Sequence, residues 1–308
     1  MAVAPFEQLM AEAKADGYAV GYFESWNLES LLAVADAAEA VRSPVILGFS
    51  GIYLPHPDRV VTDPLSAYAA VGLDTCRRLT VPACLTFNES PSRNWVSQAI
   101  ELGFHLVMYS DERITIDEQT ENVRHVCAQA HTGKSAVEAE LMPLPGVGGQ
   151  AAAPADASRL TDPDQARAFV DATGVDALAV NIGQRHLHGR QTVRLDLDRL
   201  DRLKQALDLP LVLHGASSVD RGDLEKAIGL GVCKINLGSV LKQAYLAALR
   251  DACQKVKADA NPYEVIGSGL ASDVLAAGRL TMQKVTEQWM NLFGSAGKAP
   301  ARAKVAQA

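Results

Sequence analysis

The chain has 308 residues, enough for one large domain or two ordinary ones, and its 48% hydrophobic and 21% charged residues are typical of a globular protein. Its net charge of −7 is spread along the chain without a basic stripe, which argues against nucleic-acid binding and favours a small-molecule partner. No apolar run reaches the ~20 residues that span a bilayer, so we expect no membrane association.

The first 17 residues have the pattern of an amphipathic helix, with acidic side chains at Glu7, Glu12 and Asp16. This differs from the basic and then apolar layout of a signal peptide. The five cysteines are widely spaced and include no C-x-x-C pair, which is typical of reduced residues that pack in a cytosolic protein. We therefore predict a cytoplasmic location.

Eight short apolar or β-branched runs follow, separated by stretches with helix periodicity. The predicted strands are 19–23, 44–49, 82–87, 105–109, 136–141, 176–181, 210–214 and 232–236. Between them, 27–40 and 162–172 are clear helices, the second with Thr161 as its N-cap and Pro163 in its first turn. Nearly continuous apolar runs are typical of parallel strands buried on both faces.

This alternation predicts an α/β protein folded as a (β/α)8 TIM barrel, a single domain over residues 1–294 with helices at its C-terminal end. A doubly wound open sheet is the alternative, but no G-x-G-x-x-G follows the first strand. Residues 142–160 are rich in Gly, Pro and Ala and form either a mobile lid over the barrel mouth or an ordinary surface loop. Residues 295–308 are expected to be a flexible tail.

Polar residues recur where the predicted strands end, which is where active sites of TIM barrels lie. In strand order they are Glu24, Ser50, Asn88, Glu89, Ser110, Asp111, Glu112, Glu140, Asn181, His186, His188, His214 and Asn236. A single polar residue at such a position could simply cap the helix that follows. Their recurrence at eight strand ends instead indicates one site built from carboxylates, amides and imidazoles.

Two of these histidines predict a metal site. His186 and His214 follow the sixth and seventh strands, which are neighbours in a barrel, so their rings are candidates to bind one divalent cation. Glu89 and Glu140 are the carboxylates available as a further ligand. Gly215, directly after His214, permits close approach of a ligand.

The segments HGASS and KINLGS end the seventh and eighth strands with small and hydroxyl residues before a helix. Loops at this position are the usual phosphate site of TIM barrels, where backbone N–H groups and a helix N-terminus bind the anion. Gly215, Ser217, Gly238 and Ser239 are the candidates. Two ordinary turns are the alternative interpretation.

The motifs NLESLLAVADAAEAVRSPVILGFS, VEAEL, TDPDQARAFVDATGVDALAVNIG, LPLVLHGASS and LGVCKINLGS resemble the class II fructose-bisphosphate and tagatose-bisphosphate aldolases, over roughly residues 10–290. The resemblance implies that His186 and His214 bind the metal, that Glu140 lies at or beside it and that Asn236 contacts substrate. It also implies a phosphate at Gly215, Ser217, Gly238 and Ser239, zinc as the usual metal, and a homodimer or homotetramer.

The departures from the family pattern concern the acid–base chemistry. The family ends its third strand with H-L-D-H, where the Asp transfers the proton and the last His binds metal, whereas this chain has TFNE at 86–89. Asn88 cannot take up a proton at neutral pH. Glu89 offers an anionic oxygen in place of an imidazole, which either shifts the metal preference toward Mn, Mg or Co or makes a bound zinc less acidic toward its substrate. Glu24, where the family has asparagine, Glu112 and Glu89 are candidate replacements for the Asp.

Two further departures affect the lid and the metal site. The lid lacks the acidic residues that normally follow its Gly pair, because Gly148 and Gly149 are followed by Gln and Ala. The family has a His-Gly pair after the sixth strand, and in this chain that pair is His188-Gly189. The distance along the sequence from the strand instead favours His186 as the metal ligand, so both histidines remain candidates.

The function expected from this resemblance is a lyase that makes or breaks a C–C bond in a phosphorylated ketose or sugar acid through a metal-stabilised enediolate. Two alternatives remain: a related epimerase or isomerase that uses the same intermediate without cleavage, and a non-catalytic partner subunit of an aldolase.

Overall fold

The computed structural model describes residues 3–142, 144, 160–185 and 192–300. Eight parallel strands pair in chain order, and β1 pairs with both β2 and β8, so the sheet closes on itself. The strands are β1 Val20–Phe23, β2 Val45–Ser50, β3 Ala83–Ser90, β4 Leu106–Tyr109, β5 Ala136–Glu140, β6 Ala177–Ala179, β7 Leu211–Leu213 and β8 Val232–Leu237. The predicted TIM barrel is confirmed, and the open-sheet alternative is excluded.

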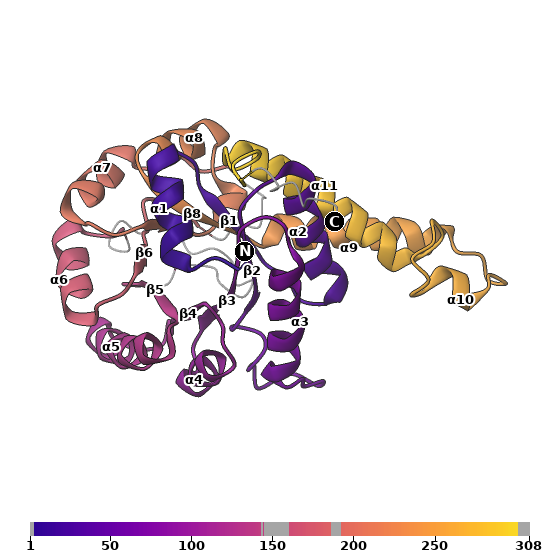
Figure 1. Cartoon of the computed structure of the whole chain (residues 1–308), viewed down its shortest axis with the longest axis horizontal. Coiled ribbons are helices and arrows are strands. Elements are labelled where there is room, and N and C mark those ends of the chain that lie inside the picture. Colours follow the sequence, from indigo (N-terminus) through magenta and orange to yellow (C-terminus); the bar gives the residue numbers. More distant parts are fainter. Residues whose placement is uncertain (1–2, 143, 145–159, 186–191, 301–308) are drawn as a thin grey trace, which may run out of the picture.

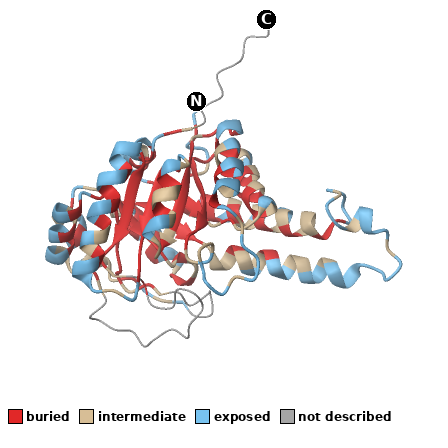
Figure 2. Cartoon of the chain, turned by 90° about the horizontal axis from the view of Figure 1, so that it is seen from below, coloured by how far each residue is buried: buried red, intermediate tan, exposed pale blue. Residues whose placement is uncertain are grey.

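Helices surround this sheet, as Figure 1 shows. They are α1 Phe6–Asp16, α2 Leu28–Val41, α3 Leu65–Arg78, α4 Arg93–Glu101, α5 Ile116–Gly133, α6 Pro163–Thr173, α7 Leu197–Ala206, α8 Arg221–Gly229, α9 Ser239–Lys255, α10 Pro262–Val265 and α11 Val274–Leu292, with a 3-10 helix η3 at Ala216–Ser218. The strands between them are almost entirely buried (Figure 2), as their continuous apolar sequences predict.

The predicted N-cap of α6 was wrong by one residue. Asp162 is the cap, and its carboxylate accepts hydrogen bonds from the amides of Asp164 and Gln165. The Thr161 hydroxyl instead accepts from the amide of Asn181, at the end of β6. Thr161 thus links two segments of the barrel and does not start a helix.

Helix α1 closes the amino-terminal end of the barrel. Its buried face, Phe6, Leu9, Met10 and Ala13, belongs to one apolar cluster with residues from all eight strands: Val20, Tyr22, Ile46, Cys84, Leu106, Ala136, Ala177, Ala179, Val212 and Cys233. In Figure 1 this indigo helix lies across the barrel. The polar residues predicted to form a site lie at the other end, where the strands finish.

Helices α9 and α11 pack on one another and project beyond the barrel (Figures 1 and 2). After α11, the amides of Gly297 and Ala299 donate to the carbonyls of Val41 and Arg42, at 2.8 and 3.0 Å. These hydrogen bonds attach residues 297–299 of the predicted flexible tail, 295–308, to the end of α2. Residues 301–308 lie outside the described residues. In the described part of the chain, no helix is both long and apolar enough to cross a membrane.

Candidate active site

The carboxyl ends of the strands bring most of the predicted polar residues to one mouth. Ser50, Asn88, Ser110 and Asn236 are each less than 10% exposed. Ser50 is the register partner of Asn88, and Asn236 donates from Nδ2 to Asn88 Oδ1 at 3.2 Å. Alternate residues of a barrel strand point inward, which explains why side chains from β2, β3, β4 and β8 meet here.

Glu89 ends β3 in a backbone conformation that is rare for a residue with a side chain. Its φ of 53° lies in the left-handed region, and the β3–β4 register shifts between Phe87 and Ser90. A bulge of this kind re-aims a side chain, and the left-handed conformation costs roughly 1–2 kcal/mol. Here the Glu89 carboxylate points at His214, with Oε1 2.7 Å from Nδ1.

His214 follows β7 and lies between two carboxylates. Its Nδ1 faces Glu89, and its Nε2 lies 2.7 Å from Oε1 of Glu138, which is fully buried on β5. Burial by itself lowers the pKa of His214, but the charge of Glu89 and the hydrogen bonds to both carboxylates outweigh it and raise the pKa to about 10. In the absence of a metal the ring is therefore a doubly protonated imidazolium.

Glu138 continues this contact into a buried polar chain. Its Oε2 lies 2.7 Å from Nζ of Lys234, and both side chains are fully buried. Lys234 also donates to Oδ1 of Asn236, which in turn bonds Asn88. Burial raises the pKa of Glu138, but Lys234 and His214 together lower it below its usual value. A continuous network thus runs across the barrel from Glu89 to Asn88.

Glu140 lies two residues after Glu138 on the same inward face of β5. It accepts a 2.5 Å hydrogen bond from the Ser110 hydroxyl. Its pKa is raised to about 7, because burial and the nearby charge of Glu89 outweigh the opposing charge of His214. The charges of Glu89 and His214 therefore both act on the protonation of Glu140.

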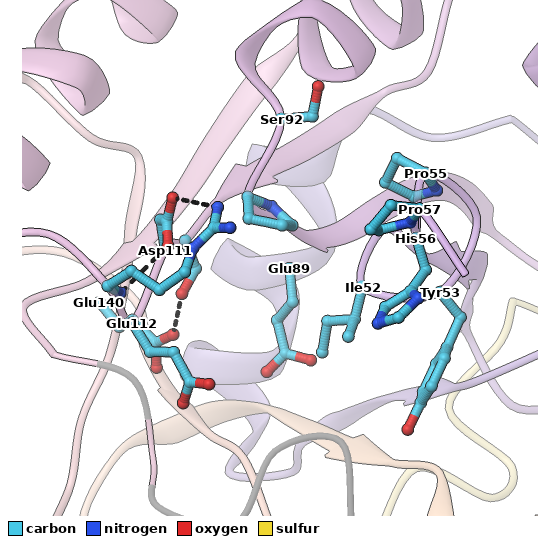
Figure 3. Close-up of a pocket in the computed structure, with 13 residues that line it drawn as sticks. Ile52, Tyr53, Pro55, His56, Pro57, Glu89, Ser92, Asp111, Glu112 and Glu140 are labelled. Atoms are coloured by element: carbon cyan, nitrogen blue, oxygen red, sulfur yellow. Dashed lines mark hydrogen bonds and ion pairs between the residues drawn. The ribbon is translucent and has the colours of Figure 1, made fainter. Parts of the chain in front are cut away.

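A pocket of about 440 Å³ opens beside Glu89 and Glu140. Figure 3 shows Glu89 between two sides of this pocket, with Glu112 and Glu140 on one side and Ile52 and His56 on the other. The carboxylate of Asp111 is held by the Arg113 guanidinium at 2.8 Å. Glu112 is exposed and lines the same pocket as Glu89 and Glu140.

The four residues predicted to bind phosphate lie at the ends of β7 and β8. Gly215, with a φ of 67°, precedes η3, which contains Ser217. Gly238 precedes α9, and Ser239 is the first residue of that helix. The two loops therefore stand side by side at the mouth, as the strand order requires. Glu24 lies at this end, with Oε1 2.6 Å from Nζ of Lys242, and it lines a different pocket from Glu89.

The chemistry of the described residues suits a divalent cation. Glu89, Glu140 and His214 offer two carboxylates and one imidazole, a set used for Zn, Mn and related ions. Burial first, and then the charge of Glu89, raise the pKa of Glu140, and a cation beside it would favour its ionised form. The present arrangement of these three residues is not that of a preformed ligand cluster among the described residues. His186 and His188 lie outside the described residues, as do 145–159 of the segment predicted to be a lid.

The sequence analysis did not single out Glu138 or Lys234. Both lie inside strands, whereas the polar residues that predict the site lie at strand ends. The two-residue period of a strand was the available signal: a side chain two positions before an inward-facing Glu140 or Asn236 must also face inward. Lys242, the partner of Glu24, was missed because it lies one turn inside α9.

Comparison with known proteins agrees with this architecture. The family model described as fructose-bisphosphate aldolase class-II matches residues 4–298. The fructose-bisphosphate aldolase of Thermus caldophilus is 31% identical over 315 residues, which cover 95% of this chain and 98% of that protein. The sulfofructosephosphate aldolase of Alkalicoccus urumqiensis is 29% identical over 300 residues, 97% of this chain and 99% of that one.

A solved structure extends the comparison to three dimensions. The crystal structure of the YdjI aldolase from Escherichia coli K12 superposes with a TM-score of 0.78 at 28% identity, covering 97% of this chain and all of the other. The structural similarity thus extends over nearly the full length of both chains and is not confined to a single motif.

Proposed function

Because the chain belongs to the class II fructose-bisphosphate aldolase family, we propose that it is a metal-dependent lyase that cleaves or forms a C–C bond in a phosphorylated ketose or sugar acid. The observation that carries the proposal is that Glu89, which contacts His214, lines the same pocket at the barrel mouth as Glu140, beside the loops of β7 and β8. A divalent cation, with zinc first and Mn, Mg or Co as alternatives, supplies a Lewis acid that polarises the substrate carbonyl.

Glu89, Glu140 and His214 are the described residues that would hold the cation, with His186 as the further candidate. For His214 to act as a ligand, its Nδ1 must lose its proton. Its Nε2 then remains protonated and donates a hydrogen bond to Glu138, which fixes the tautomer and the orientation of the ring. Lys234 keeps Glu138 ionised for this task. Asn88 and Asn236 offer amide groups to substrate hydroxyls.

We further propose that Glu112 takes the proton-transfer role that the family assigns to the aspartate replaced by Asn88. Glu112 lines the same pocket as Glu89 and Glu140, whereas Glu24 lines another. The carboxylate of Glu112 is exposed to the pocket, where a substrate hydroxyl can reach it (Figure 3). Glu112→Gln should retain bound metal but lower the cleavage rate by ~10²–10⁴.

The test is a cleavage assay on metal-loaded protein with a panel of ketose phosphates, including fructose and tagatose bisphosphates, with triose phosphate release as the readout. Release that disappears in His214→Ala together with the bound metal supports the proposal. A protein that binds metal but releases no triose phosphate from any substrate rejects it. Solvent deuterium entering the substrate without fragmentation would identify an epimerase or isomerase instead.

The chain is also proposed to form a homodimer or homotetramer. The projecting part formed by α9, α10 and α11 exposes large apolar side chains, namely Leu246, Tyr263, Ile266, Leu270 and Leu280. A lone chain rarely leaves so many of them in water on one extension. Light scattering coupled to size-exclusion chromatography measures the assembly directly, and a monomer at micromolar concentration contradicts it.

A further inference from the structure

Glu24 lies against the start of α9, at the end of the site proposed for phosphate. Its amide donates to the carbonyl of Leu237 at 2.9 Å. A Cβ placed on Gly238 would come within 2.2 Å of Glu24 Oε2, so the Glu24 carboxylate lies close against the backbone at Gly238. An anionic group of the protein itself therefore occupies space beside Gly238.

Lys242 holds this carboxylate in place. Its Nζ lies 2.6 Å from Glu24 Oε1 and over the rings of Trp26 and Tyr53, at 5.5 and 5.3 Å from their centroids. Two aromatic faces favour an ammonium group in this position. The Lys242 side chain remains 39% exposed and lines, with Ser50, a pocket of about 410 Å³. A ligand can thus reach the ammonium from the barrel mouth.

The two charges have opposite effects on an anion that binds at Gly238 and Ser239. A phosphate there meets the Glu24 carboxylate at short range, and like charges so close disfavour binding. The same carboxylate pairs with Lys242, a cation one turn into the helix that begins at Ser239. If Glu24 moves aside, the repulsion falls and the ammonium is released for the ligand.

We propose that Lys242 is a further phosphate-binding residue of this site and that Glu24 is its internal competitor, which the substrate phosphate must displace. The inference rests on the proposed function for the location of the phosphate. It gives Glu24 a role in substrate affinity and not in proton transfer.

The experiment measures binding of inorganic phosphate and of glycerol 3-phosphate to the purified full chain by isothermal titration calorimetry. Glu24→Gln keeps the shape of the side chain and removes its charge, so phosphate should bind about tenfold more tightly or better. Lys242→Met removes the cation and should weaken binding by about tenfold or more. Glu121→Gln is the matched control, because it removes the carboxylate of an exposed ion pair with Arg124 on α5 and should leave the affinity unchanged.

Opposite shifts in the two variants support the inference, provided that near-ultraviolet circular dichroism shows both to be folded. Unchanged or weaker phosphate binding by Glu24→Gln, or unchanged binding by Lys242→Met, overturns it, as does a failure of every variant to bind phosphate. The readout needs no turnover. Opposite shifts in a protein without cleavage activity would keep this inference and reject the lyase, whereas an active enzyme without the shifts would reject this inference alone.

Discussion

Replacing Glu138 by glutamine should test the buried network most directly. Glu138 has no exposed surface and contacts two cationic groups, Lys234 and His214, at 2.7 Å each. Glutamine fills the same volume and still accepts a hydrogen bond from His214 Nε2. The substitution removes the negative charge that compensates Lys234. Lys234 is itself fully buried, and it would keep its hydrogen bond to Asn236 but lose its ion pair.

The magnitude follows from burial. Breaking a buried ion pair by removing one partner costs roughly 3–5 kcal/mol, because an uncompensated charge stays inside the protein. In a chain of this size each kcal/mol corresponds to roughly 2–4 °C, so the melting temperature should fall by roughly 6–20 °C. Glu138→Gln/Lys234→Met removes both charges and should recover most of this loss.

The assay is thermal and urea-induced unfolding of chelator-treated protein, so that bound metal does not add to the stability. Glu121→Gln, at an exposed ion pair, serves as the control and should change the unfolding free energy by less than about 1 kcal/mol. If Glu138→Gln were as stable as the control, or if the double variant were no more stable than the single one, the buried pair would not support the barrel as argued.

Three further predictions follow from the backbone and the electrostatics. Glu89→Gly should be more stable than Glu89→Ala by about 1 kcal/mol in urea unfolding, because both lose the carboxylate but only glycine tolerates the φ of 53° freely; equal stabilities would contradict the strain. Gly48→Ala should lower the unfolding free energy by about 1–3 kcal/mol, since the new Cβ would lie 2.3 Å from the Thr86 carbonyl oxygen, and a melting temperature like that of wild type would refute this. Hydrogen bonds from Arg194 lower the pKa of Asp223 below 3.8, so its stabilisation is present above that pH and is lost as the pH falls through the folded-state pKa; Asp223→Asn should flatten the acid side of a pH–stability curve, and an unchanged slope would show that the pair is not responsible.

The barrel could be predicted from the sequence because its signal is repeated eight times. Continuous apolar runs such as 44–49 and 210–214 are typical of buried parallel strands, and errors of one to three residues at the strand ends do not change the topology. The same logic placed Glu89, Glu140 and His214 at one mouth, since the carboxyl ends of parallel strands must share an edge.

The pairing of side chains inside the mouth was not predictable to the same degree. The left-handed conformation of Glu89 leaves no trace in the sequence, because the residue is not glycine and the bulge depends on how β3 meets β4. The contact between Glu24 and Lys242 joins residues 218 positions apart through side-chain rotamers. Strand periodicity fixes the face on which a residue lies, but not which of several neighbours it binds.

The way the barrel closes also bears on synthesis of the chain. Strand β1 pairs with β8, and the amide of Ala19 bonds the carbonyl of Phe293, so the earliest and latest parts of the polypeptide meet at one seam. Lys234 and Asn236 reach the mouth only with β8. A nascent chain on the ribosome therefore contains Glu89 and Glu138 before Lys234 and Asn236 are synthesised, so the buried polar network can form only after β8 has emerged.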